Sequence, residues 1–237
     1  MPKKPMTAQE VAEMRARILT QALSLLAEKG FEGFSMREVA RRMGVVIGTL
    51  YGYYGSKDEV YLAVLTWGFE RLHDRCRAAG APHAEPLERL KAMGREYMDF
   101  GMTEPNFYNL MFTWHVPKFA DYVGTDREPA ARHELETALR VYELFLATAR
   151  AYASGLQVED EEAVRFYVIY LWCTLHGYIA GINNTLLNYM HDSPATLSGD
   201  FLETLFNQAG FFAAQARGFG PGRPRAAVAN LREGRRK

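Results

Sequence analysis

Residues 44–60 read GVVIGTLYGYYGSKDEV, and this stretch decides the fold of the N-terminal part of the chain. It holds three tyrosines and four glycines, yet its apolar spacing predicts a short helix over 46–53. A helical wheel divides the side chains into an inward and an outward group. The inward group is Val46, Leu50 and Tyr54 with Ile47 beside them, packed on Met36, Val39 and Met43, and the outward group is Gly48, Thr49, Tyr51 and Gly52.

The outward group predicts contact with a nucleic acid. A glycine inside a helix costs about 1 kcal/mol relative to alanine, so two glycines in so short a helix need a compensating role. A surface without bulky side chains lets the backbone approach phosphates or base edges closely. Thr49 can donate to a phosphate or touch a thymine methyl group. We therefore expect residues 46–53 to enter a groove of DNA.

The flanking sequence predicts the helices around this segment. Three capping-box patterns, which satisfy free backbone N–H groups at a helix start, are Thr7-x-x-Glu10, Ser35-x-x-Glu38 and Ser56-x-x-Glu59. The first helix is expected to end at Gly30, and a short helix over 36–43 is followed by a tight break at Gly44. These dimensions are those of a helix-turn-helix, so residues 1–60 are predicted to form a three-helix DNA-binding domain.

The same residues resemble a known family. GVVIGTLYGYYGSKDEV, with SMREVARRMG and RILTQALSLLAEKGFEGFSMREVA upstream, is similar over residues 11–66 to the helix-turn-helix of the TetR family of bacterial transcriptional regulators. The family pattern is approximately Gly-Val-Ser-x-Gly-Thr-Leu-Tyr-x-Tyr-Phe-x-Ser-Lys-x-x-Leu. The resemblance implies a dimeric all-α repressor with a divergent C-terminal ligand domain. By position, the DNA contacts that it implies are Arg37, Gly48, Thr49, Tyr51, Tyr53 and Lys57, and our predicted DNA-binding residues add Val46 and Gly52 of the same helix.

Two departures from the family pattern bear on DNA recognition. Val46 stands where the family usually has a Ser or Thr helix cap, so one side-chain acceptor is missing. Gly52 replaces a larger side chain, which leaves operator preference to DNA shape as much as to base contacts. Packing is an alternative role for Tyr53, and solvated charges are the favoured interpretation of Arg41 and Arg42. Lys3 and Lys4 are either a DNA-contacting arm or without a role.

The rest of the chain also predicts helices, so the fold class is all-α. We expect them over 86–102, 105–116, 128–154, 161–190 and 199–217, with Pro105, Pro129 and Pro194 near helix starts. Residues 61–217 would form the effector-binding and dimerisation domain. Residues 218–237 would form a basic, mobile tail, for which contact with DNA is left open.

An apolar ligand cavity is expected in the C-terminal domain, because residues 97–122 are rich in aromatic side chains with methionines among them. Trp172-x-x-x-His176-Gly177 also resembles a segment of the family's ligand domain. The candidate effector contacts are Phe107, Tyr108, Met111, Phe112, Trp114, Tyr142, Trp172, His176 and Asn183. An ordinary aromatic core and a buried, hydrogen-bonded His176 are the alternatives.

A homodimer through the two C-terminal helices is expected. Gly177 and Gly181, four residues apart, would permit close helix approach. On the last helix the candidate interface residues are Phe201, Leu205, Phe211 and Phe212. Two-fold symmetry would turn the two helices of each chain into a four-helix interface.

Composition excludes several classes of protein. Residues 1–75 hold 11 basic and 9 acidic residues, 76–216 hold 10 and 18, and 217–237 hold 7 and 1, so net charge gives no general argument for nucleic-acid binding. The two cysteines and the absence of a secretory signal at the N-terminus indicate a reducing, cytoplasmic protein. The apolar stretch 166–182 is followed by polar residues that disfavour a membrane span.

Neither a metal site nor an enzyme is predicted. His73-x-x-Cys76, with His83 nearby, lacks a second ligand cluster, and no nucleophile or phosphate-binding motif occurs. No cofactor is expected. The predicted function is a ligand-responsive repressor that binds a pseudo-palindromic operator and is released by a small apolar or aromatic effector. The rivals are an enzyme in the C-terminal domain and an architectural DNA-binding protein without an effector.

Overall fold

The computed structural model describes residues 6–206, and this part of the chain contains helices and no strand, which confirms the all-α prediction. The elements run in the order α1 (Ala8–Gly33), α2 (Met36–Met43), α3 (Ile47–Tyr51), α4 (Lys57–Gly80), α5 (Pro86–Thr103), α6 (Pro105–Tyr108), the π-helix η1 (Asn109–Thr113), α7 (Phe119–Tyr122), α8 (Glu128–Gly155), α9 (Glu161–Asn183), the 3₁₀-helices η2 (Leu186–Tyr189) and η3 (Pro194–Leu197), and α10 (Ser198–Phe206). Within residues 6–206 no helix has the length and apolar character needed to cross a bilayer.

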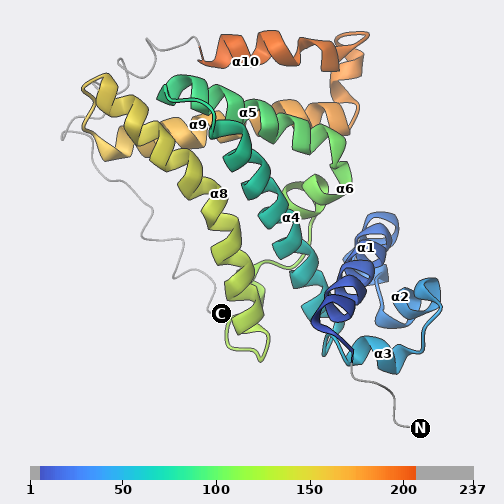
Figure 1. Ribbon diagram of the computed structural model, residues 1–237. Helices are drawn as coiled ribbons and strands as arrows, with labels where there is room; N and C mark the ends of the chain where they lie inside the picture. Colours follow the sequence, from blue (N-terminus) through green and yellow to red (C-terminus); the bar gives the residue numbers. More distant parts are fainter. Residues whose placement is uncertain (1–5, 207–237) are drawn as a thin grey trace, which may run out of the picture.

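Helices α1, α2 and α3 form a small N-terminal unit, and α4 joins it to the larger C-terminal bundle (Figure 1). The first turn of α4 contacts the N-terminal unit, and its later turns pack between α5 and α8. Helix α9 lies against α5 and α8, and α10 lies along α5. The expected domain boundary at residue 60 therefore falls inside one continuous helix, which connects the two units mechanically.

The predicted helix caps form, but only one of the three predicted capping boxes is complete. The Thr7 hydroxyl accepts the Glu10 N–H at 3.2 Å, and the Glu10 carboxylate accepts the Thr7 N–H at 2.7 Å. Ser35 and Ser56 likewise accept the N–H three residues on, at 3.3 and 3.2 Å. The reciprocal bonds are absent at these two caps because the glutamates have other partners: Glu38 binds Arg41 and Glu59 accepts the Gly55 N–H.

Gly30 bends α1 rather than ending it. Its φ of 67° and ψ of 178° leave the helical region, a conformation that favours glycine, and the chain then continues through Gly33. The bend places the Phe31 ring against the Tyr61 ring of α4, with centroids 4.9 Å apart at an interplanar angle of 68°. The last turn of α1 is thereby packed onto the helix that enters the C-terminal bundle.

Several predicted helices end earlier than expected. The segment predicted as one helix over 105–116 divides into α6 and η1, and Trp114 is already extended. The helix predicted over 161–190 ends at Asn183, because Thr185 takes a left-handed conformation with φ 59°. Helix α10 is described from Ser198 to Phe206, and the remainder of the predicted 199–217 helix lies outside the described residues, as does the tail.

The structure corrects part of the predicted dimer surface. Leu205 is buried within its own chain beside Phe206, whose ring edge reaches Gly94 of α5. Gly181 is covered by the side chain of Leu187, so neither Leu205 nor Gly181 is free to meet a second chain. Gly177 has open space around it, while Phe211 and Phe212 lie outside the described residues.

Candidate nucleic-acid interface and candidate ligand cavity

The turn between α2 and α3 is built on Gly44. Gly44 has φ 67° and ψ 30°, the left-handed conformation that commonly ends a helix at glycine. The Val45 N–H then returns to the Ala40 carbonyl at 3.1 Å. Helix α3 starts after Val46, whose side chain supplies no cap, and Leu50 alone of its five residues is buried. Leu50 is thus the one buried side chain of α3, and the other residues of this short helix are at least partly exposed.

The inward placement of Val46 and Ile47 is wrong. Val46 is 75% exposed because it precedes the first helical residue and is extended, so the helical wheel does not apply to it. Ile47 is 38% exposed and Tyr51 52% exposed. A Cβ added to Gly48 would meet no atom within 4 Å, and Gly52 is exposed. These five residues form what we call the α3 surface, which is slim, apolar and unobstructed within the described chain.

A groove beside the α3 surface brings together residues from three helix starts. It has a volume of about 460 Å³ and is lined by Ser35, Met36, Arg37, Ile47, Tyr51, Gly55, Ser56, Lys57 and Asp58. Arg37 is exposed and has no ion pair among the residues that the structure describes. The free N–H groups at the starts of α2 and α4 favour an anion. The groove can therefore receive a phosphate between Arg37 and Lys57.

Three other predicted DNA contacts are partly occupied within the chain. The Lys57 ammonium lies 4.4 Å from the centroid of the Phe31 ring and 3.5 Å from the Phe31 carbonyl oxygen. The Tyr53 hydroxyl lies 3.2 Å from the Met6 sulfur, and its ring is partly buried against the core. Thr49 is half-buried. Their contacts with DNA remain predictions.

Arg41 and Arg42 are held in surface ion pairs. Arg41 donates twice to Glu38, at 2.9 and 2.7 Å. Arg42 reaches Glu28 of α1 with both of its terminal nitrogens. These pairs agree with the interpretation of both arginines as solvated charges, and they brace α2 on α1.

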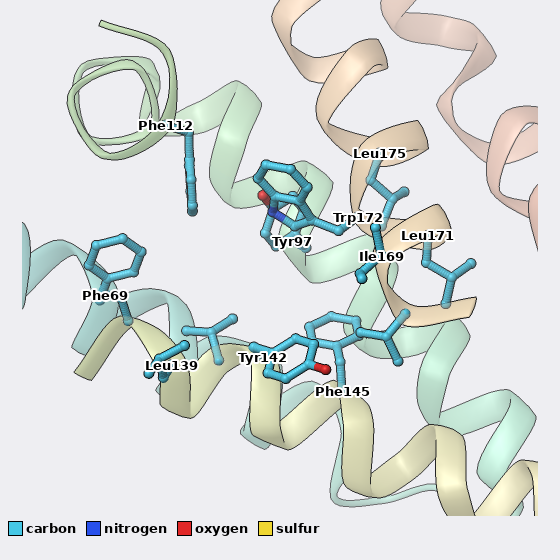
Figure 2. Close-up of a pocket in the computed structure, with 13 residues that line it drawn as sticks. Phe69, Tyr97, Phe112, Leu139, Tyr142, Phe145, Ile169, Leu171, Trp172 and Leu175 are labelled. Carbon is cyan, nitrogen blue, oxygen red and sulfur yellow. The ribbon is translucent and has the colours of Figure 1, made fainter. Parts of the chain in front are cut away.

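A largely apolar cavity lies in the C-terminal bundle (Figure 2). Its volume is about 340 Å³, within the range of small-molecule sites. The lining comes from α4, α5, η1, α8 and α9, and consists of Phe69, Tyr97, Phe112, Ala138, Leu139, Val141, Tyr142, Phe145, Val168, Ile169, Leu171, Trp172 and Leu175. None of these side chains is charged, and the arrangement suits an uncharged, ring-bearing ligand.

Three of the predicted effector contacts line this cavity: Phe112, Tyr142 and Trp172. The others lie elsewhere. Phe107 and Met111 are buried against Gly68 of α4, where a Cβ would approach them to 2.9 and 2.7 Å.

Trp114 lines a separate surface hollow beside residues 29–32 and 115–118. The Asn183 amide donates to the Gly101 carbonyl at 3.0 Å. Packing between helices that are far apart in the chain places these residues away from the cavity lining, and the sequence alone does not show this packing.

Tyr108 and His176 support the cavity wall from behind. The Tyr108 hydroxyl lies 2.6 Å from His176 Nδ1, and the imidazole stacks on the Trp172 indole with centroids 4.9 Å apart at 17°. Burial lowers the pKa of His176, so the ring is neutral at pH 7 and Nδ1 accepts from Tyr108. Neither residue lines the cavity; they fix the orientation of Trp172, which does.

Sequence reasoning missed most of the lining on α8 and α9. Ala138, Val141, Tyr142 and Phe145 recur at helical spacing and form one face of α8. That periodicity predicts a buried face, but it does not distinguish a cavity wall from a filled core. Leu139 and Ile169 are exposed apolar residues at the mouth of the cavity. No local sequence pattern indicates that they lie there.

The start of α4 is tied to the segment that follows η1. The Tyr61 hydroxyl donates to the Pro117 carbonyl at 2.8 Å, and the Tyr122 hydroxyl donates to Asp58 at 3.0 Å. Arg127, at the start of α8, donates to the Ser56 hydroxyl at 3.0 Å. The helix after the α3 surface is therefore bonded both to the segment after η1 and to α8, and η1 and α8 carry cavity-lining residues.

Metal binding is not supported in the described part of the chain. Within residues 6–206 no group of three or more His, Cys, Asp or Glu side chains could hold an ion. Cys76, part of the spacing noted in the sequence, is buried beside the Met93 carbonyl.

Comparison with known proteins gives two matching family models. One, described as bacterial regulatory proteins of the tetR family, matches residues 18–64. The other, described as a tetracyclin repressor-like C-terminal domain, matches residues 90–197. The two matches cover α2, α3 and most of the cavity-lining helices.

Individual relatives are transcriptional regulators. HTH-type transcriptional repressor KstR of Mycobacterium tuberculosis is 28% identical over 160 residues, 68% of this chain and 68% of the relative. KstR of Rhodococcus jostii is 40% identical over 79 residues, 33% of this chain and only 36% of that protein.

Solved structures agree in fold. A putative transcriptional regulator from Pseudomonas aeruginosa has a TM-score of 0.69 at 20% identity, covering 88% of this chain and 94% of that one. FadR from Bacillus subtilis, in complex with stearoyl-CoA, has a TM-score of 0.61 at 17% identity, covering 81% and 97%. At these identities the similarity establishes the architecture alone.

Proposed function

The chain belongs to the TetR family of bacterial regulatory proteins, and from that membership we propose that it is a homodimeric repressor released from its operator by a small apolar effector. Membership itself makes the chain a DNA-binding regulator and not an enzyme. The operator, the dimer and the effector are the parts proposed here. Each rests on a separate feature of the structure.

The observation that carries DNA binding is the α3 surface. Val46 and Tyr51 are exposed, and the backbone beside them is kept narrow by Gly48 and Gly52. A major groove about 12 Å wide admits such a helix. Arg37 and the helix starts beside it would hold the phosphates on the groove wall, as phosphate contacts set position while base contacts set sequence.

A stripe on α9 supports the dimer. Ile169 is 51% exposed, Cys173 is exposed, and a Cβ added to Gly177 would meet no atom within 4 Å, so these three residues line one side of the helix at intervals of four. A second copy packed there by two-fold symmetry would bury the stripe. The two α3 surfaces of the dimer would then lie about 34–36 Å apart, to meet successive major grooves.

Effector response is proposed as a population shift. A ligand in the cavity contacts α4, η1, α8 and α9, and α4 leads directly to the DNA-binding unit. If the ligand binds one separation of the α3 surfaces better than another, it shifts the dimer toward that state. Lowering operator occupancy 100-fold requires about 2.7 kcal/mol of differential binding free energy.

A mobility-shift experiment with the operator tests DNA binding. We expect the double variant Tyr51→Ala with Lys57→Ala to lose the operator shift, while its dimer and melting temperature stay close to those of the parent. Arg77→Ala, an exposed residue on α4 away from the groove, is the control and should bind normally. Retained nanomolar binding by the double variant would show that the contact surface lies elsewhere.

A further inference from the structure

The α3 surface carries apolar side chains that no described residue covers. Val46, Ile47 and Tyr51 are all exposed, and α3 lies at the outer edge of the N-terminal unit (Figure 1). Exposed apolar side chains that gather on one surface mark interaction sites. On a DNA-binding unit, this surface requires an apolar group of the DNA as its partner.

The side chains that usually read bases are absent from this segment. In the major groove, arginine and lysine recognise guanine, asparagine and glutamine recognise adenine, and glutamate and aspartate recognise cytosine. Residues 45–55, VVIGTLYGYYG, contain none of these residue types and no histidine. Among the side chains of this segment that can form hydrogen bonds, Thr49 is half-buried, and Tyr53 and Tyr54 pack partly against the core. The segment therefore has few groups that distinguish bases by hydrogen bonds.

The cations on either side of this segment are assigned to phosphates or to ion pairs. Arg37 and Lys57 line the groove beside the α3 surface, together with the starts of α2 and α4, where a phosphate can be held. Arg41 and Arg42 are held in ion pairs with glutamates of α2 and α1. Among the described residues, base recognition in the major groove is thus left mainly to the apolar residues at the start of α3.

One base presents an apolar group in the major groove. The C5-methyl group of thymine lies there, and apolar side chains recognise it by contact. In a helix-turn-helix the N-terminal residues of the recognition helix meet the base edges, and at the start of α3 these residues are Val46 and Ile47. Val46 also stands where the family pattern has a serine. An apolar side chain therefore replaces a polar one at a position that meets base edges.

We propose that the start of α3 selects thymine methyl groups, with Val46 as the residue that sets the preference in each half-site of the operator. The assignment rests on the proposed function, because it names the bases that the same α3 surface reads. Burial of one methyl group corresponds to about four-fold in Kd. Guanine, adenine and cytosine lack this group, and the start of α3 has no charged or amide side chain to recognise them instead.

Replacement of single bases in a bound duplex tests the assignment. Selection with the full-length chain from a library of random duplexes gives the operator, and each half-site should keep at least one thymine. Deoxyuridine in place of such a thymine removes the methyl group alone, and fluorescence anisotropy should show binding about four-fold weaker for each methyl removed. At the same position, 5-methylcytosine should bind about four-fold more tightly than cytosine, because it restores the methyl group in another base pair.

A valine variant identifies the residue that contacts the methyl group. In Val46→Ala the penalty for deoxyuridine should fall to within about two-fold at one thymine of each half-site, because the contacting side chain is shortened. Val123→Ala is the matched control: Val123 is also exposed, but it lies at the end of α7, outside the DNA-binding unit, so the four-fold penalty should remain. A penalty that stays unchanged in Val46→Ala would overturn the role of Val46.

The scan with deoxyuridine uses the parent protein, so it separates this assignment from operator binding. If selection yields a defined operator in which deoxyuridine is tolerated at every thymine, operator binding stands and the thymine assignment is wrong. If selection yields no preferred duplex, the proposed operator binding fails and the assignment fails with it.

Discussion

At the residue scale, Val46 shows how a single position departs from the pattern around it. The helical wheel placed it inward, yet it is the residue before the first helical turn, and its backbone is extended with ψ 144°. A wheel applies only to residues inside a helix, and element boundaries are the least certain part of sequence reasoning. Leu50, which does lie inside the helix, is buried as predicted.

The missing cap at Val46 gives a stability prediction. Val46→Ser should supply the acceptor that α3 lacks and raise the free energy of unfolding by about 0.5–1 kcal/mol, since an exposed valine loses little packing on replacement. Urea denaturation followed by circular dichroism measures the change, with Val46→Ala as the uncapped control. Equal stability of the serine and alanine variants would show that the start of α3 does not accept a side-chain cap.

Glu134 gives a prediction for pH. Burial raises its pKa from 4.5 to about 7, and the nearby Lys118 opposes this only partly. Because the folded state binds the proton more tightly than the unfolded state, the stability that protonated Glu134 contributes is complete below about pH 4.5 and is lost as pH rises through about 7.

Glu134→Gln should remove this component of the pH dependence. Between pH 5 and 7.5 the parent should lose up to about 3 kcal/mol of unfolding free energy relative to the variant, measured by denaturant titration at each pH. Glu136→Gln, on the exposed side of α8, should follow the parent. Parallel curves for the parent and Glu134→Gln would mean that Glu134 titrates normally.

At the element scale, sequence patterns identified where helices exist and where most of them start. The caps at Thr7, Ser35 and Ser56 each begin the expected helix, because a cap is a local bond that depends on few residues. The π-helix over 109–113 was not predicted. It packs against a distant glycine on α4, Gly68, through Met111, and no local sequence pattern indicates that contact.

For the cavity, too, the sequence predicted the kind of lining residue but not every residue that lines it. An aromatic-rich wall was predicted from residues 97–122, and Tyr97 and Phe112 do line the cavity. Phe107 and Met111 instead fill the space above Gly68. Sequence spacing shows which residues are apolar, but which of them face empty volume is decided by how helices far apart in the chain approach one another.

The exposed stripe on α9 gives a prediction about assembly. Gly177→Leu should abolish the dimer in light scattering while helical content is retained, because within residues 6–206 no atom from outside its own stretch of helix lies within 4 Å of the added Cβ. The loss would therefore arise from the second copy. Gly155→Leu, also in open space but at the end of α8, should remain dimeric. A dimer that persists in Gly177→Leu would place the interface on another face.

At the scale of the whole molecule, the proposed effector response requires that a ligand among α8, α9 and η1 affect a surface on α3. The bonds at the start of α4 offer a physical route. Arg127 of the α8 start donates to Ser56, which caps α4, and its guanidinium lies 3.8 Å from Glu59. Helix α4 follows the α3 surface after a short turn, so we expect a shift of α8 to be transmitted to α4 through this contact.

Arg127→Ala should therefore weaken the coupling between effector and operator. Operator affinity without effector should stay within about three-fold of the parent, while an effector-induced release of about 100-fold should fall to about ten-fold, a loss near 1.4 kcal/mol of coupling. Fluorescence anisotropy of a labelled operator, titrated with and without effector, measures both quantities. Arg77→Ala is the matched control, because its ion pair with Asp74 lies within the last turns of α4, away from the contact with α8, and its removal should leave the coupling intact. Equal coupling in the two variants would mean that the signal reaches α4 by another route, with the Tyr61–Pro117 bond to the segment after η1 as the next contact to remove.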